Sequence, residues 1–240
     1  MAAKLIDLSF TLNGRKVKVQ IAPDTMLFAL LREQGCASVR CACETTNCGL
    51  CTVWLDGDPV LSCSVPAARV EGHTITTLEG LKAESEALAR AMAAEGAEQC
   101  GFCAPGLIMN LLALARAAKE DPSLVATREE LSRQLAGNLC RCSGYESQLR
   151  AIVRFLNESG VQVGFEMPEL SVNDTSCDGV TYKQITHKQP KKDSKALLEG
   201  RPVYTGDMVP AGALIVKLKR SPYARAKIRS IDTSRALKVP

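Results

Sequence analysis

The chain has 240 residues, of which 46% are hydrophobic and only 4% aromatic, and its formal net charge is +4. This length allows one large domain or two small domains with a tail. No run of like charge is long enough for a nucleic-acid-binding arm, so that class of partner is not expected. No apolar stretch could span a bilayer, and residues 1–7 lack the apolar core of a secretory signal. We therefore expect no membrane span and a cytoplasmic location.

The first 78 residues have the pattern of a small β-sheet packed on one helix. Apolar residues alternate on both sides of Asn13 and Gly14, which is the strongest short signal for a hairpin. The other expected elements are a helix over 26–32 that ends at Gly35, and strands over 52–55, 60–63 and 69–78. This order of elements is typical of a β-grasp domain, here residues 1–78.

Strong helix formers predominate after residue 78, beginning with the Ala-, Leu-, Glu- and Lys-rich stretch 79–95. Pro105 marks the first turn of a second helix, and Thr127 with Glu130 forms a capping box for a third. An apolar stripe at helical spacing over 145–156 predicts a fourth. Residues 79–160 are therefore expected to form a four-helix domain.

The last third of the chain has weaker patterns. Residues 161–200 are rich in Pro, Asp, Ser, Thr and Lys, which favours a linker. Strands are expected at 203–207 and 213–218, in a truncated α/β segment that covers 201–240. Because a few strands cannot bury much apolar surface, we expect this segment to be mobile in the isolated chain. The predicted fold class is α+β.

Eight of the eleven cysteines form two sets with informative spacing. In a reducing compartment, clustered cysteines indicate a metal or redox site rather than disulfides. The first cysteine set is Cys43, Cys48, Cys51 and Cys63, and the second cysteine set is Cys100, Cys103, Cys140 and Cys142. No role is assigned to Cys36, Cys41 and Cys177.

The first cysteine set has the C-x4-C-x2-C spacing of plant-type [2Fe-2S] proteins, with a fourth cysteine further along the chain. One loop thus supplies three thiolates and a separate strand supplies the last. Cys41 and Cys43 cannot both be ligands without breaking this spacing, so we choose Cys43. Gly49 next to Cys48 would allow backbone N–H groups to approach the sulfurs.

The second cysteine set joins a C-x2-C pair to a C-x-C pair, and each pair precedes a predicted helix. A helix N-terminus offers unpaired N–H groups and a partial positive charge, and both stabilise thiolates and an anionic cluster. The residues therefore predict two [2Fe-2S] clusters and one-electron transfer. Two alternatives stay open: four thiolates could also hold zinc in a structural module, or the chain could be a free-standing ferredoxin-like carrier.

Three segments together resemble the iron–sulfur portion of the molybdenum hydroxylases, the xanthine dehydrogenase and aldehyde oxidoreductase family. They are residues 39–53, the motif QCGFCAPG at 99–106 and the motif GNLCRCSGY at 137–145. The resemblance implies a plant-type ferredoxin-like domain followed by a helical domain, with one [2Fe-2S] cluster held by each cysteine set. It also implies that Gln99 lies beside a molybdopterin cofactor.

The same resemblance extends to the tail, because residues 200–205 and 220–228 are similar to the opening of the family's molybdopterin-binding subunit. It implies an oxidoreductase component that acts on N-heterocycles such as purines, or on aldehydes. The chain alone lacks the molybdenum site, so a molybdopterin-binding large subunit or the rest of a fusion is the expected partner. FAD is expected only on a separate flavin subunit, with an external electron acceptor as the alternative.

One departure from the family pattern lies in the first cluster loop. The family usually places Gly where this chain has Ala42, Glu44 and Thr46. A more restricted backbone is expected to alter hydrogen bonds to the sulfurs, and hence the potential, without preventing ligation.

Overall fold

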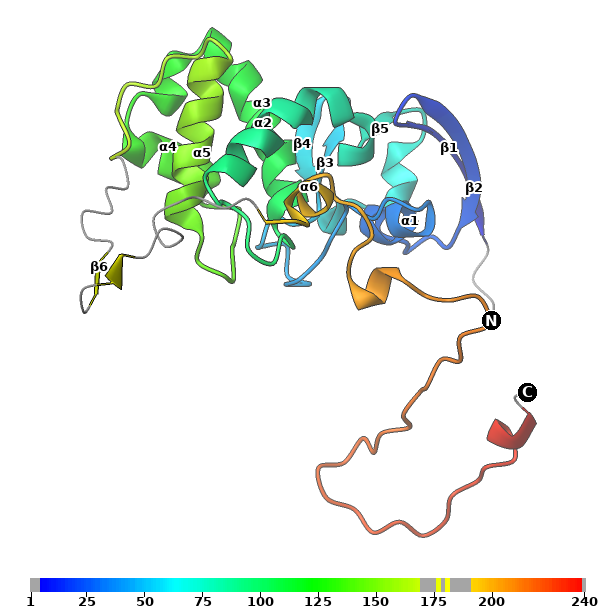
Figure 1. Ribbon diagram of the computed structural model, residues 1–240. Helices are drawn as coiled ribbons and strands as arrows, with labels where there is room; N and C mark the ends of the chain where they lie inside the picture. The colour runs from blue at the N-terminus through cyan, green and yellow to red at the C-terminus, as the bar shows by residue number, and fades with distance from the viewer. Residues whose placement is uncertain (1–4, 169–175, 178–179, 182–190, 239–240) are drawn as a thin grey trace. The chain divides into compact units, whose positions relative to one another are not determined.

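The computed structural model describes residues 5–168, 176–177, 180–181 and 191–238 (Figure 1). The chain divides into two compact units, Met1–Asp207 and Met208–Pro240. The first unit contains a five-stranded sheet and a group of helices. Figure 1 shows α2, α3, α4 and α5 gathered at one end of this unit, and β1, β2 and α1 at the other. The fold is α+β, a ferredoxin-like sheet domain followed by a helical domain.

The sheet has the strand order β2-β1-β5-β3-β4. Its strands are β1 (Ile6–Leu12), β2 (Arg15–Ile21), β3 (Thr52–Leu55), β4 (Asp58–Leu61) and β5 (Thr74–Thr76). The predicted hairpin at Asn13 and Gly14 is confirmed, with φ angles of 49° and 79° that suit the left-handed turn between β1 and β2. The second hairpin turns at Asp56 and Gly57, so β4 begins two residues earlier than expected.

Helix α1 (Leu27–Glu33) packs on the sheet and confirms the first predicted helix. Its side chains Leu27, Leu30 and Leu31 are fully buried in one hydrophobic core with residues of β1, β3 and β5. The predicted strand over 69–78 is wrong except at β5. A turn in which the His73 N–H donates to the Val70 carbonyl interrupts the alternating pattern, and a 3₁₀ turn, Ala67–Val70, precedes it.

The helical part consists of α2 (Lys82–Ala94), α3 (Ala104–Glu120), α4 (Arg128–Leu135) and α5 (Tyr145–Glu158). The predicted cap of α4 is present, since the Thr127 hydroxyl accepts the Glu130 N–H at 3.1 Å. Trp54 of β3 belongs to the helical core rather than the sheet core, and its indole N–H donates to the Met109 carbonyl of α3 at 3.0 Å. The two parts are therefore joined by a buried contact. Within the described ranges, no helix is long and apolar enough to cross a membrane.

The structure differs from the expected linker near its C-terminal end. Residues 191–207 pack against the rest of the first unit and include α6 (Ser194–Leu198), in which Leu197 and Leu198 are buried. Other parts of the expected linker, 169–175, 178–179 and 182–190, lie outside the described residues. Between them are two short paired strands, β6 (Ser176–Cys177) and β7 (Val180–Thr181).

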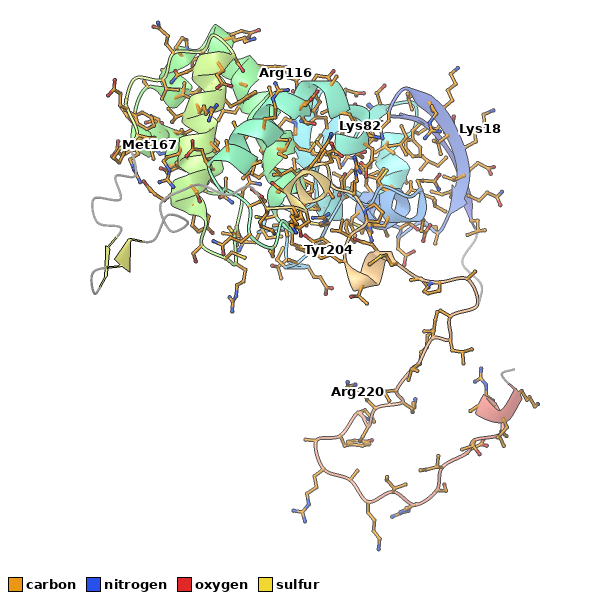
Figure 2. The ribbon with its side chains drawn as sticks, in the orientation of Figure 1. Lys18, Lys82, Arg116, Met167, Tyr204 and Arg220 are labelled. Carbon is orange, nitrogen blue, oxygen red and sulfur yellow. The ribbon has the colours of Figure 1, made fainter. Side chains whose placement is uncertain are left out.

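The strands predicted at 203–207 and 213–218 are wrong. Residues Thr205–Asp207 form a 3₁₀ turn, and 213–218 have no regular structure. The apolar side chains of the second unit, such as Leu214 at 87% and Val216 at 85%, are exposed. Figure 2 shows side chains projecting from the extended chain there, Arg220 among them. A strand needs neighbouring strands to pair its backbone groups, and none of the described residues pairs with this segment.

The contrast between the core and the second unit gives a test of the fold. Ile108 of α3 is fully buried, whereas Ile228 is 73% exposed. Replacing a buried Ile by Ala removes packed methylene groups and leaves a cavity, which typically costs about 2–5 kcal/mol. We expect Ile108→Ala to lower the thermal midpoint, followed by helical circular dichroism, by roughly 4 °C or more. The matched change Ile228→Ala should leave it unchanged, and an equal loss in both variants would contradict this packing.

Candidate functional site

The first cysteine set lies in the loop between α1 and β3 and in the turn after β4. The sulfurs of Cys51 and Cys63 are 3.2 Å apart. The Cys48 N–H donates to the Cys43 sulfur at 3.4 Å, and these two side chains also contact each other. The structure thus brings the four predicted residues together as two pairs.

Backbone donors distinguish Cys43 from its neighbour Cys41. The N–H groups of Asn47, Thr45 and Cys48 point at the Cys43 sulfur and lower its pKa to about 6. Burial instead raises the pKa of Cys41, which faces the same group of thiols. Cys43 is therefore the better thiolate of the two. Burial and then contact with Cys51 raise the pKa of Cys63 to about 12, so a bound cation would have to displace its proton.

The loop that holds Cys43 adopts a backbone that glycine would favour. Glu44 and Thr46 have φ angles of 51° and 58°, in the left-handed region. For an L-residue, and above all for a β-branched one, this conformation costs about 1 kcal/mol. These are two of the positions where the family pattern has glycine, so in this chain larger side chains occupy a left-handed backbone.

The second cysteine set lies at the starts of two helices, as predicted. Cys103 directly precedes α3, and Cys140 and Cys142 lie just before α5. The thiol of Cys100 contacts that of Cys142, and the thiol of Cys103 contacts that of Cys140. The thiol of Cys142 also contacts that of Cys140, so the four thiols form one connected group. A small cavity between the helix starts is lined by all four cysteines.

Two polar side chains of α5 support the second cysteine set. The Tyr145 hydroxyl accepts the backbone N–H of Cys140 at 2.8 Å, and the buried Gln148 amide donates to the Cys103 sulfur at 3.9 Å. Burial, followed by contact with Cys140, raises the pKa of Cys103 to about 12. A backbone N–H from Cys100 instead holds the pKa of Cys142 below its usual range.

The arrangement of the cysteine side chains decides whether a single metal ion or a two-iron cluster fits each site. Among the described residues, no three or more Cys, His, Asp or Glu side chains converge on a point that could hold a single metal ion. Each cysteine set instead gathers four thiols that contact one another in sequence or in pairs. A [2Fe-2S] cluster takes four thiolates, two on each iron, so this donor set fits a two-iron cluster better than a single tetrahedral zinc.

The two cysteine sets meet through a tight backbone contact. The N–H of Leu139 donates to the carbonyl of Cys48 at 3.0 Å. Gly49 has a φ of 76°, and a Cβ atom there would lie 2.2 Å from the carbonyl oxygen of Gly137. Gly106 of α3 packs just as closely, since its Cβ would lie 2.5 Å from the Gly49 oxygen. These two glycines allow the loop that carries Cys43, Cys48 and Cys51 to lie directly on α3 and on the turn at 137–139.

A groove of about 420 Å³ runs between the two cysteine sets. Cys43 and Cys48 line it from the first set, and Cys100, Cys103 and Cys140 from the second. A larger groove of about 700 Å³ lies elsewhere, between the β3–β4 hairpin and helices α3 and α4, and no cysteine lines it. The chemically relevant cavity is therefore the smaller one.

Several residues that act on the site were missed by sequence reasoning. Arg40 is buried, and its guanidinium donates to the Gly101 carbonyl at 2.9 Å. Burial lowers the pKa of Arg40, although arginine stays charged in proteins. The sequence did carry a signal that could have identified Gln148, because this polar residue lies beside the apolar stripe of α5. The contacts of Arg40 with residues far along the chain had none. Gln99 itself is exposed, with its backbone carbonyl bound to Lys191.

Comparison with known proteins agrees with these two sites. A family described as "2Fe-2S iron-sulfur cluster binding domain" matches residues 10–76. A second, described as "[2Fe-2S] binding domain", matches residues 77–153. The boundary between the two matches falls just before α2.

Two bacterial proteins are among the relatives of this chain. The xanthine dehydrogenase iron–sulfur-binding subunit of Escherichia coli O157:H7 is 42% identical over 154 residues, which are 63% of this chain and 94% of that subunit. The aldehyde oxidoreductase of Megalodesulfovibrio gigas is 31% identical over 244 residues, 98% of this chain but 26% of that protein. This chain therefore spans about a quarter of the second relative.

A solved structure shows the same fold. Quinoline 2-oxidoreductase from Pseudomonas putida 86 matches with a TM-score of 0.58 and 34% identity, over 65% of this chain and 96% of that one. The chain belongs to the iron–sulfur subunits and domains of the molybdenum hydroxylase family, that of xanthine dehydrogenase and aldehyde oxidoreductase, and is the electron-transfer component, with two 2Fe-2S domains, of such an oxidoreductase.

Proposed function

We propose that this chain passes single electrons between a molybdenum-bearing partner and an acceptor, with one [2Fe-2S] cluster on each cysteine set. The first would be held by Cys43, Cys48, Cys51 and Cys63, and the second by Cys100, Cys103, Cys140 and Cys142. The observation that carries this assignment is that each set brings four thiols together at one place. When bound, each cluster supplies reversible one-electron redox chemistry.

The protein's own residues supply charge stabilisation and a defined route. Backbone N–H groups at Cys43 and the helix starts at Cys103 and Tyr145 stabilise negative charge on the sulfurs. The hydrogen bond from the Leu139 N–H to the Cys48 carbonyl links the sets by a short path of bonds. The path begins at the Cys48 side chain and crosses the hydrogen bond between the Cys48 carbonyl and the Leu139 N–H. It then follows the backbone from Leu139 to the next residue, Cys140. Electron exchange between the two sites is expected to depend on this contact.

The substrate and partner are inferred from the relatives. Among them are a xanthine dehydrogenase subunit and a nicotinate dehydrogenase small FeS subunit, and the match to an aldehyde oxidoreductase covers 98% of this chain. We infer that the partner is a molybdopterin-binding large subunit or segment, and that the complex oxidises an N-heterocycle, such as a purine, or an aldehyde. The exposed Gln99 is the residue of this chain that we assign to the molybdopterin contact. A separate flavin subunit or an external acceptor would take the electrons, in the cytoplasm.

One measurement separates this proposal from the two alternatives. A tagged chain would be purified anaerobically from its own cells, reduced, and examined by EPR and by iron, zinc and molybdenum analysis. We expect two S = 1/2 signals, about four irons per chain and co-purifying molybdenum. Two signals without molybdenum would instead favour a free-standing carrier. Zinc without an EPR signal would leave only a structural module.

The ligand assignment predicts which cysteine affects which signal. Cys48→Ser should remove one of the two EPR signals and Cys103→Ser the other, because each removes one of four thiolates from one set. Cys41→Ser is the matched control, since Cys41 lies in the same loop beside Cys43 and should leave both signals. Loss of a signal in Cys41→Ser, with both signals kept in Cys43→Ser, would show that the wrong ligand was chosen.

The contact between the sets can be tested without touching a cysteine. Gly49→Ala would place a Cβ 2.2 Å from the Gly137 oxygen, so the first cluster loop must move away and lengthen the Leu139–Cys48 hydrogen bond. We expect both EPR signals to remain while electron exchange between them, followed by rapid-freeze EPR after partial reduction, becomes slower. Gly137→Ala is the control, because a Cβ there meets nothing within 4 Å. Equal rates in the two variants would argue against this route.

A further inference from the structure

Residues 191–207, here called the strap, lie against the loop that carries the first half of the second cysteine set. The strap includes α6, and it is drawn in orange in Figure 1. Tyr204, labelled in Figure 2, is one of its contact residues. No sequence pattern indicated that this part of the chain would reach the cysteines.

The strap and Arg40 bind four successive carbonyl groups of the loop 99–102. Lys191 donates to the Gln99 oxygen at 2.5 Å, and the Tyr204 hydroxyl donates to the Cys100 oxygen at 2.6 Å. The Arg40 guanidinium donates to the Gly101 and Phe102 oxygens at 2.9 and 3.3 Å. All these donors come from outside the loop, and two of the three side chains are cationic.

Arg40 is itself held in place by the strap. Its guanidinium donates to the Tyr204 hydroxyl at 3.4 Å and to the Arg201 carbonyl at 3.5 Å. It lies 5.4 Å from the centre of the Phe102 ring and 4.7 Å from that of Tyr204, and the two rings contact each other edge to face. Such contacts stabilise a desolvated cation. Burial raises the pKa of the Tyr204 hydroxyl, so this group keeps its proton and remains a donor at neutral pH.

Two glycines let the strap fit this closely. A Cβ at Gly101 would lie 2.6 Å from the Leu197 side chain of α6. Gly200 has a φ of 68°, and a Cβ there would lie 2.5 Å from the Cβ of Ser38. The end of the strap is tied to α1 by an ion pair between Arg32 and Asp207 at 3.0 Å. The strap is thus a docked element with matching surfaces at several points.

We propose that the strap is a positioning element that raises the reduction potential of the [2Fe-2S] site formed by the second cysteine set. This inference rests on the ligand assignment proposed above. With its carbonyls bound on the outside, the loop directs an N–H group inward, and Phe102 N–H donates to the Cys100 sulfur at 3.5 Å. Positive charge on Lys191 and Arg40 favours the reduced, more negative state of that site, and Lys191 also forms an ion pair with Asp193 at 3.2 Å.

Three strap variants remove these effects in different ways. Lys191→Met removes a charge, Tyr204→Phe removes a donor but keeps the ring, and Gly200→Ala pushes the strap away from Ser38. The matched controls are exposed Lys192→Met, exposed Tyr223→Phe, and Gly206→Ala, whose Cβ would meet nothing within 4 Å. Tyr204→Phe is the mildest change, so a failure of another variant to fold would not prevent the test.

The readout is the midpoint potential of each EPR signal, measured by redox titration of the full chain. For Lys191→Met we expect the reduced-to-oxidised ratio of the second site at a fixed potential to fall by about tenfold, which is about 59 mV for a one-electron couple. Tyr204→Phe and Gly200→Ala should shift the same midpoint downward. The first site and all three controls should keep the midpoints of the unaltered chain.

The outcomes separate this inference from the proposed function. Two EPR signals with midpoints that do not move in Lys191→Met and Tyr204→Phe would overturn the role of the strap and leave the ligand assignment intact. Equal shifts of both midpoints would also overturn it, since Lys191 and Tyr204 donate to carbonyls of the loop 99–102, which carries only second-set cysteines. Absence of a second [2Fe-2S] signal from the unaltered chain would overturn the ligand assignment and this inference together.

Discussion

The absence of a side chain at Gly49 is the constraint on which the arrangement of the two sites depends. The first cluster loop can lie on the turn at 137–139 only because no Cβ stands between them, and Gly106 removes the same obstacle from α3. The hydrogen bond from Leu139 to the Cys48 carbonyl then closes the contact. Two segments that are separated by most of the helical domain in sequence thereby become neighbours, which is what a relay between two redox sites requires.

Charge imposes the second requirement, because an iron–sulfur site collects several thiolates in a partly buried place. Burial, together with contact with a neighbouring thiol, raises the pKa of Cys63 and of Cys103 to about 12. Backbone N–H groups at Cys43, and the helix N-termini that follow Cys103 and Cys142, stabilise the negatively charged sulfurs. Near the second set, Arg40 adds a full charge, and its contacts with the Phe102 and Tyr204 rings partly offset its desolvation. The two cysteine sets therefore lie in different electrostatic surroundings, although each contains four cysteines.

Local chemistry made much of the fold predictable. The hairpin at Asn13–Gly14 follows from the left-handed φ angles that this turn needs, and the start of α4 follows from the Thr127 cap. Predictions failed where a neighbour was decisive. Alternation at 69–78 suggested one strand, but a turn after Val70 left only Thr74–Thr76 to pair. The apolar residues at 213–218 had strand character but found no strand to pair with among the described residues.

The sequence by itself determined the chemistry of the site, because cysteine spacing limits which thiols one loop can present, and motifs placed before helices bring stabilising dipoles with them. Tertiary structure decided which thiols of the second set meet, since Cys142 contacts both Cys100 and Cys140, and Cys103 contacts Cys140. It also decided that Arg40, Lys191 and Tyr204 bind the loop 99–102. Those partners lie roughly 60 to 100 residues from the loop. Periodicity and local propensity report on neighbours a few residues apart, so contacts at this separation become visible only after the chain has folded.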